Sequence, residues 1–179
     1  MWVSARGGNH RPPYTRQVHT DASLVVEFLN TVNVEEGTDL LEDPGQWREW
    51  AAAHALAANP APEARAARDA LRAAIGDPRL PGGSDGTVGT VGTVNVSTRI
   101  SLTAEGPALV ADDVVGAVFA ACARLVVRGD WIRLKICPAD TCLWAFYDES
   151  RNRSRTWCSM RVCGNREEAR GWRARAAAG

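Results

Sequence analysis

Apolar residues recur with the spacing of an α-helix in four stretches of the chain. These stretches cover residues 21–32, 44–54, 62–75 and 113–128. Plausible N-caps precede three of them: Thr20 or Asp21, then Asp43, which stands directly before Pro44, then Asp112. The pattern predicts four amphipathic helices that bury their apolar faces in one core, with a loop at 33–43 between the first two.

The remaining part of this region has a different pattern. Residues 1–20 predict a flexible tail, and residues 81–94 predict a mobile low-complexity loop, since three Gly-Thr-Val repeats bury little surface. Residues 95–102 alternate as in a strand, and 108–110 supply a hairpin partner across Glu105-Gly106. We therefore expect a helical domain over 21–128 with one small β-hairpin.

Composition narrows the class of protein. Hydrophobic residues make up 45% of the 179 residues, which is enough for a core. No apolar run reaches membrane-spanning length, and the N-terminus has no apolar signal core. These features predict a soluble cytoplasmic protein that does not enter the membrane.

Charge is divided unequally along a chain whose formal net charge is zero. Residues 1–123 hold 9 basic and 15 acidic side chains, whereas residues 124–179 hold 12 basic and 6 acidic ones. The basic half favours an anionic partner. The alternative is that the two halves attract and neutralise each other.

Four of the five cysteines form two close pairs. Cys137 and Cys142 are separated by four residues, 15 residues follow, and Cys158 and Cys163 repeat the first spacing. Two such pairs are typical of a tetrahedral four-thiolate zinc site, with each turn aiming two sulfurs at one point. The fifth, Cys122, lies in an apolar helical stripe and is expected to be an inert buried thiol.

Other uses of four cysteines remain open at this point. Two disulfides need an oxidising compartment, for which nothing in the sequence argues. An iron–sulfur cluster also takes four thiolates. A catalytic zinc needs an open coordination position, which four cysteine ligands do not leave. The spacing favours one structural zinc ion and no enzymatic chemistry at the metal.

Arginines cluster around the cysteines. The run 151–155 alternates Arg with small polar residues, so it predicts an exposed loop, and Asn165 is placed to cap a final helix. Arg166, Arg170 and Arg173 share one face of that helix, which suits phosphate contacts. The alternative is an amphipathic helix docked by Trp172, which lies roughly opposite, with a charged face that is only solvated. The predicted DNA-binding residues are Arg151, Arg153, Arg155, Arg166, Arg170 and Arg173.

The C-terminal sequence resembles the bacterial CGNR zinc-finger family over about residues 131–173. The resemblance is carried by the segment 155–160, by Cys163-Gly164-Asn165-Arg166, and by the stretch ending at 148–152. Phe28-Leu29-Asn30-Thr31, with the helix at 47–50, resembles the ABATE domain found with this finger. We therefore expect a mainly α, α+β chain: a helical ABATE-like domain, then a four-cysteine zinc module (129–179) ending in a helix.

The resemblance implies a transcription regulator that binds DNA. By position, the four cysteines are the zinc ligands, and Arg151, Arg153, Arg155 and Arg166 are the family's basic positions. Many members have Arg where this chain has Thr156, and Lys where it has Glu168. Both differences lower the local positive charge.

Three functions are compatible with these features. In the first, the zinc module binds DNA and the N-terminal domain senses a small-molecule effector or forms a homodimer. In the second, the module docks on a transcription-machinery protein and does not bind DNA. In the third, Asn30, Asn33, Trp47 and Trp50 line a ligand or catalytic pocket, although the helical region has no nucleophile–base pair or phosphate-binding loop.

Overall fold

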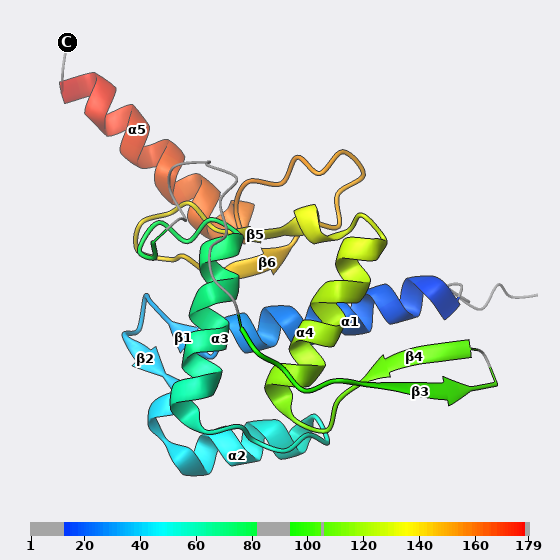
Figure 1. Cartoon of the computed structure of the whole chain (residues 1–179). Helices are drawn as coiled ribbons and strands as arrows, with labels where there is room; N and C mark the ends of the chain where they lie inside the picture. The colour runs from blue at the N-terminus through cyan, green and yellow to red at the C-terminus, as the bar shows by residue number, and fades with distance from the viewer. Residues whose placement is uncertain (1–12, 82–93, 105, 178–179) are drawn as a thin grey trace, which may run out of the picture.

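The computed structural model describes residues 13–81, 94–104 and 106–177. Most of the expected tail and loop, at 1–12 and 82–93, lies outside these ranges. Within them, five α-helices and three two-stranded antiparallel sheets follow one another (Figure 1). The mainly helical α+β class and the order of a helical region before a four-cysteine segment with a final helix are confirmed.

The first helix, α1, spans Pro13–Leu29. Residues 13–20 are therefore helical where the sequence predicts a loose tail. The expected loop at 33–43 contains a small hairpin of β1 (Val32–Asn33) and β2 (Thr38–Asp39), followed by the 3-10 turn η1 (Leu40–Glu42). This hairpin escapes prediction because each strand has only two residues.

The next helices are close to their predicted positions. Helix α2 is Pro44–Ala53, and the Asp43 carboxylate accepts hydrogen bonds from the backbone N–H groups of Gly45 and Gln46 as predicted. Helix α3 is Ala61–Ala74, and helix α4 is Val114–Val127. The cap of α4 is Asp113, since its carboxylate accepts from the N–H of Gly116, whereas the predicted cap Asp112 pairs with Arg99.

The predicted hairpin is formed by β3 (Arg99–Thr103) and β4 (Gly106–Val110). The 3-10 turn η2 (Trp131–Arg133) leads into β5 (Leu134–Ile136), which pairs with β6 (Ala145–Tyr147). The chain ends in a π-helical segment, η3 (Met160–Gly164), continued by α5 (Asn165–Ala177). Figure 1 shows α5 projecting away from the other helices.

One hydrophobic core joins the helical region to the cysteine segment. Helix α1 packs against α3, α4 and β6. Phe28 and Leu125 are fully buried in this core, and Leu134 of β5 and Ala145 of β6 belong to the same cluster. The two segments expected as separate domains therefore share buried surface. A second, smaller apolar cluster surrounds the cysteines.

Arg72 of α3 is the largest fully buried side chain of the described residues. Its Nε atom donates to Asp77 at 2.8 Å, its Nη1 to the carbonyl of Leu29 at 2.8 Å, and its Nη2 to the carbonyl of Leu143 at 2.6 Å. A buried charge is stable only when it is paired and hydrogen-bonded, and here both conditions are met. Arg72 thus ties the end of α1 to the turn that follows Cys142.

None of the helices in the described ranges is both long and apolar enough to cross a membrane.

Asp77 gives a testable pH dependence. Burial alone would raise its pKa, but hydrogen bonds from Arg79 and Arg72 outweigh burial and lower the pKa to about 2. A lowered pKa means that Asp77 stabilises the fold above about pH 4 and loses that contribution as the pH falls towards 2, a change of about 2 kcal/mol. Urea unfolding of wild type and Asp77→Asn over this range should show the stability difference shrinking by that amount.

Asp140→Asn is the matched control, because Asp140 is 86% exposed. Its stability difference from wild type should stay flat over the same pH range. A constant difference between wild type and Asp77→Asn would contradict the role given to Asp77.

Candidate metal centre and nucleic-acid interface

The four clustered cysteines converge on one point. Their Sγ atoms all lie within 4.8 Å of one another. Cys158 Sγ is 3.5 Å from Cys142 Sγ and 3.6 Å from Cys163 Sγ. Zinc–sulfur bonds of about 2.3 Å in a tetrahedron place the sulfurs about 3.8 Å apart. No disulfide joins them. The sulfurs are therefore placed to bind one metal ion, as predicted.

Backbone hydrogen bonds shape the first cysteine turn. The N–H of Cys137 donates to the carbonyl of Trp144 at 2.9 Å, and the N–H of Cys142 donates to the carbonyl of Ala139 at 2.8 Å. Leu143 takes a φ of 50°, which turns the chain sharply from Cys142 into β6. The carbonyl of Leu143 is the one that accepts from Arg72.

The second turn is the start of the final helix. The Ser159 hydroxyl accepts from the N–H of Val162, and its carbonyl accepts from the N–H of Cys163 at 2.9 Å. Ser159 therefore caps this helical segment. The prediction that Asn165 is the cap is wrong, because the chain is already helical from Met160.

Gly164 lies in close contact with two side chains beside the cysteines. A Cβ atom at this position would collide with Met160 Sδ and lie 3.1 Å from the Trp157 ring. A larger residue would displace Met160 or the Trp157 ring. Because Met160 is flexible and 53% exposed, its side chain has room to move, whereas the Trp157 ring has less.

The pKa values of the clustered thiols shift in different directions. Burial raises the pKa of Cys142 to about 11 and also raises the pKa of Cys158. Burial opposes ionisation of Cys137 too, but backbone hydrogen bonds involving Cys158 and Ala139 outweigh it and lower the pKa.

A dication offsets the cost of four neighbouring thiolates, and four sulfur ligands leave no open position for a reacting molecule. The set fits a structural zinc ion. Cys122 stays outside it, buried, with its pKa raised by burial to about 12.

A buried ion pair holds the loop after β6 in place. This loop carries the arginines of the run 151–155. The carboxylate of Asp148 is fully buried and accepts from Lys135 Nζ at 2.7 Å and from the N–H groups of Ser150 and Arg155. Burial works against the ionised form, but these hydrogen bonds keep the pKa of Asp148 well below its usual range. Lys135 also donates to the carbonyls of Arg153 and Arg155. The loop is therefore anchored at several backbone positions.

Two of the six predicted DNA-binding arginines contact the metal centre itself. Arg155 lies over the Phe146 ring, 4.9 Å from its centroid, and donates to the carbonyls of Trp157 and Cys158. Arg166 donates to Glu35 at 3.0 Å, to Thr141 at 3.1 Å, and weakly to Cys163 Sγ at 3.9 Å. Both guanidinium groups brace the cysteine turns.

The other four arginines are exposed. Arg170 pairs with Asp140 at 3.5 Å and with Glu167 at 3.3 Å. Arg151, Arg153 and Arg173 have no side-chain ion pair with the residues that the structure describes. Trp172 is 67% exposed, so it does not dock the helix as the alternative interpretation expected.

The structure gives three residues roles beside the metal centre that the sequence did not predict, although Asn30 was a candidate pocket residue. Asn30 donates from its amide to the carbonyl of Ala145 and accepts from the N–H of the same residue, both at 2.8 Å, so it acts as a strand partner for β6. Arg72 holds the first cysteine turn through the carbonyl of Leu143. Lys135 holds the loop that precedes Cys158. Two signals were available: Lys135 is the chain's single Lys, and Arg68 and Arg72 continue the apolar face begun by Ala64.

The fold and the metal centre define a protein with a zinc finger built onto a helical domain. The family model of the CGNR zinc finger matches residues 133–176. The model named ABATE, described as "putative stress-induced transcription regulator", matches residues 22–129, more than half of the chain, and the chain belongs to this family. A comparison with curated proteins gave no match.

Metal removal should disturb more than the finger. Chelation or Cys158→Ser should abolish the near-ultraviolet Trp signal of the module, because zinc binding is coupled to folding. Loss of the turn after Cys142 also removes one acceptor of Arg72, so the helical region should stay folded but lose about 1–3 kcal/mol of stability. Near-ultraviolet circular dichroism and urea unfolding measure the two effects.

Cys122→Ser is the control for this experiment. Mass spectrometry under native conditions should find one zinc ion in wild type and in Cys122→Ser, and none in Cys158→Ser. A metal-free protein with unchanged Trp signal and unchanged stability would rule out the structural role of the metal.

Zinc affinity should fall as the pH falls. Because Cys142 and Cys158 have raised pKa values, both are protonated near neutral pH in the metal-free protein, and binding must release both protons. For each proton that zinc binding releases, the association constant for zinc falls roughly tenfold when the pH is lowered by one unit. Competition with a chelator of known pH dependence, between pH 6.5 and 8.5, should give a slope of at least two. A flat profile would mean that the thiols are already ionised.

Proposed function

We propose that this chain is a DNA-binding transcription regulator. The zinc ion holds the C-terminal module folded, and arginines on its surface contact phosphates. The N-terminal domain senses a small ligand or forms a homodimer. The membership of the ABATE family and the CGNR match support the regulator class. A cytoplasmic location and the absence of enzymatic activity go with this proposal as predictions.

One observation carries the DNA-binding part of the proposal. The loop after β6 is held rigidly by Asp148 and Lys135, yet Arg151 and Arg153 at its tip remain exposed and without ion pairs among the described residues. Rigid presentation reduces the entropy lost when a guanidinium binds a phosphate. Arg173 on α5 is exposed in the same way. These three arginines are the proposed phosphate contacts, whereas Arg155, Arg166 and Arg170 already contact other groups of the protein.

A second function is favoured by a different observation. Met160, Val162 and Trp172 are each more than half exposed, so the finger carries apolar as well as basic surface. Exposed apolar surface of this kind is typical of protein interfaces. The alternative is therefore a module that docks on an RNA polymerase or sigma-factor surface without contacting DNA.

Salt dependence tests the DNA-binding proposal. Fluorescence anisotropy with a random 20-base-pair duplex at 50–200 mM salt should show affinity that falls with salt, because phosphate contacts release counterions. The double variant Arg151→Gln/Arg153→Gln should reduce the slope of log affinity against log salt by about 2. Arg48→Gln, which removes one exposed arginine on α2, should leave the slope unchanged.

The same assay separates the two functions. Absence of DNA binding at 50 mM salt would reject the first, and salt-resistant binding of purified RNA polymerase holoenzyme that is lost in Trp172→Ser would then favour the second.

A further inference from the structure

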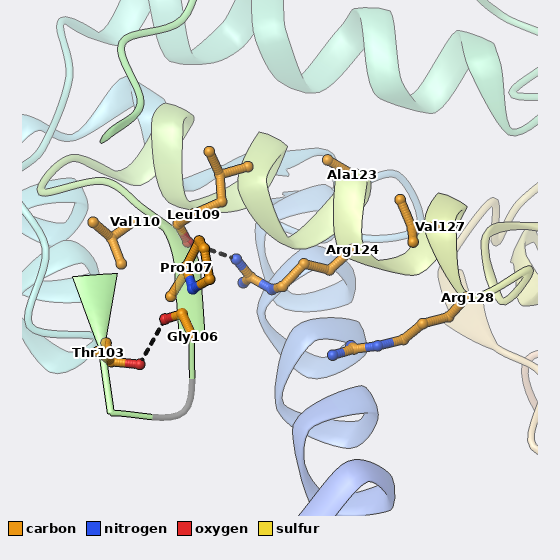
Figure 2. A pocket seen from close by; sticks show the side chains of 10 residues that line it. Thr103, Gly106, Pro107, Leu109, Val110, Ala123, Arg124, Val127 and Arg128 are labelled. Atoms are coloured by element: carbon orange, nitrogen blue, oxygen red, sulfur yellow. Dashed lines mark hydrogen bonds between the residues drawn. The ribbon is translucent and has the colours of Figure 1, made fainter. Parts of the chain in front are cut away.

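Two surface hollows of this chain differ in what their lining residues leave for another molecule. In the hollow beside α4 and β4, Arg124 already donates to Asp21 and to the carbonyl of Leu109 (Figure 2). That guanidinium therefore serves the fold. A second hollow, of about 320 Å³, lies between α1 and β6, and Cys158 of the metal centre is one of its lining residues. This second hollow brings solvent next to a metal ligand.

Cys158 is the most accessible of the four clustered cysteines. It is partly exposed, whereas Cys137, Cys142 and Cys163 keep only 0%, 7% and 1% of their surface in contact with solvent. A small molecule that enters the hollow therefore meets Cys158 before it meets the other three cysteines.

Two further sulfurs lie next to Cys158. Its Sγ atom is 3.5 Å from that of Cys142 and 3.6 Å from that of Cys163. A thiol that binds zinc is deprotonated, and the thiolate is the reactive form of cysteine. Thiolate character, exposure and a neighbouring thiol are the features of cysteines that oxidise reversibly. Cys158 in the zinc-loaded protein combines all three.

We propose that Cys158 is an oxidation site for hydrogen peroxide, which reaches it through this hollow. The Cys158 sulfur attacks one peroxide oxygen, the O–O bond breaks, and the leaving hydroxide takes a proton from solvent to become water. The thiolate of Cys142 or Cys163 then attacks the sulfenic acid at Cys158. An S–S bond forms, the S–O bond breaks, and the second hydroxide also leaves as water after taking up a proton. Two thiolates lose two electrons, and one peroxide and two protons become two water molecules.

The reaction removes two of the four thiolates from the metal centre. Zinc is bound by thiolates and not by a disulfide, so the oxidised protein should lose its zinc ion and the finger its support. Oxidation would then unfold the proposed DNA-binding module. Only this consequence for DNA binding rests on the proposed function, since the oxidation site rests on the metal centre alone.

The test follows zinc release by hydrogen peroxide from the full chain loaded with one zinc ion. With dimedone present to trap sulfenic acids, peptide mapping early in the reaction should find the label at Cys158. Without dimedone, the first disulfide should join Cys158 to Cys142 or Cys163. Reductant and zinc should then restore the near-ultraviolet Trp signal, because a disulfide, unlike a sulfinic acid, is readily reduced.

Ser23→Phe tests the route to Cys158. Ser23 is exposed on α1 and lines the same hollow, so a ring at this position should fill the hollow without disturbing the core. The variant should keep one zinc ion but release it about fivefold more slowly, because access governs thiol oxidation. Ala52→Phe, at an exposed position of α2, and Cys122→Ser should release zinc at the wild-type rate.

The proposal is overturned if dimedone labels Cys137, Cys142 or Cys163 first, or if the first disulfide lacks Cys158. It is also overturned if Ser23→Phe releases zinc as fast as wild type does. None of these measurements involves DNA, so a failure of the DNA-binding proposal and a failure of the oxidation site give different results.

Discussion

The buried guanidinium of Arg72 is the constraint on which the arrangement of the chain depends. A charge without solvent needs acceptors on every side, and Arg72 takes them from three segments: Asp77 after α3, Leu29 at the end of α1, and Leu143 in the first cysteine turn. Moving any of these segments would leave a buried donor unpaired, at a cost of several kcal/mol. The helical region and the finger are therefore held in one relative position.

The zinc finger is for this reason not an appendage on a linker. The Asn30 side chain pairs with both backbone groups of Ala145 as a neighbouring strand would, so a helix end substitutes for a third strand beside β5 and β6. Glu35, in the turn between β1 and β2, adds a contact to Arg166. The cysteine turns are thus shaped from outside by the helical region and from inside by the metal. The contacts from the helical region and the metal both act on the segment that begins directly after Cys142.

The sequence predicted what depends on local pattern. Helix positions follow from apolar spacing and caps such as Asp43, and the zinc ligands follow from cysteine spacing alone. It failed where a contact joins distant residues. A capping carboxylate at Asp112 or Asp113 satisfies the same local rule, and only the pairing of Arg99 with Asp112 separates them. The role of Arg72 depends on carbonyls 43 and 71 positions away, which no local pattern encodes.

Net charge along the sequence is a poor measure of the charge that a partner meets. Of the basic second half, Arg124 and Arg128 face Asp21, and Arg166 faces Glu35, so part of its excess neutralises acidic groups of the first half. These ion pairs join the acidic first half of the chain to the basic second half, which was the alternative to an anionic partner. Lys135 is used to hold the loop backbone. Within the described residues, Arg151 and Arg153 at the tip of that loop and Arg173 on α5 are exposed and have no side-chain ion pair, so they differ from the basic residues that the fold itself uses.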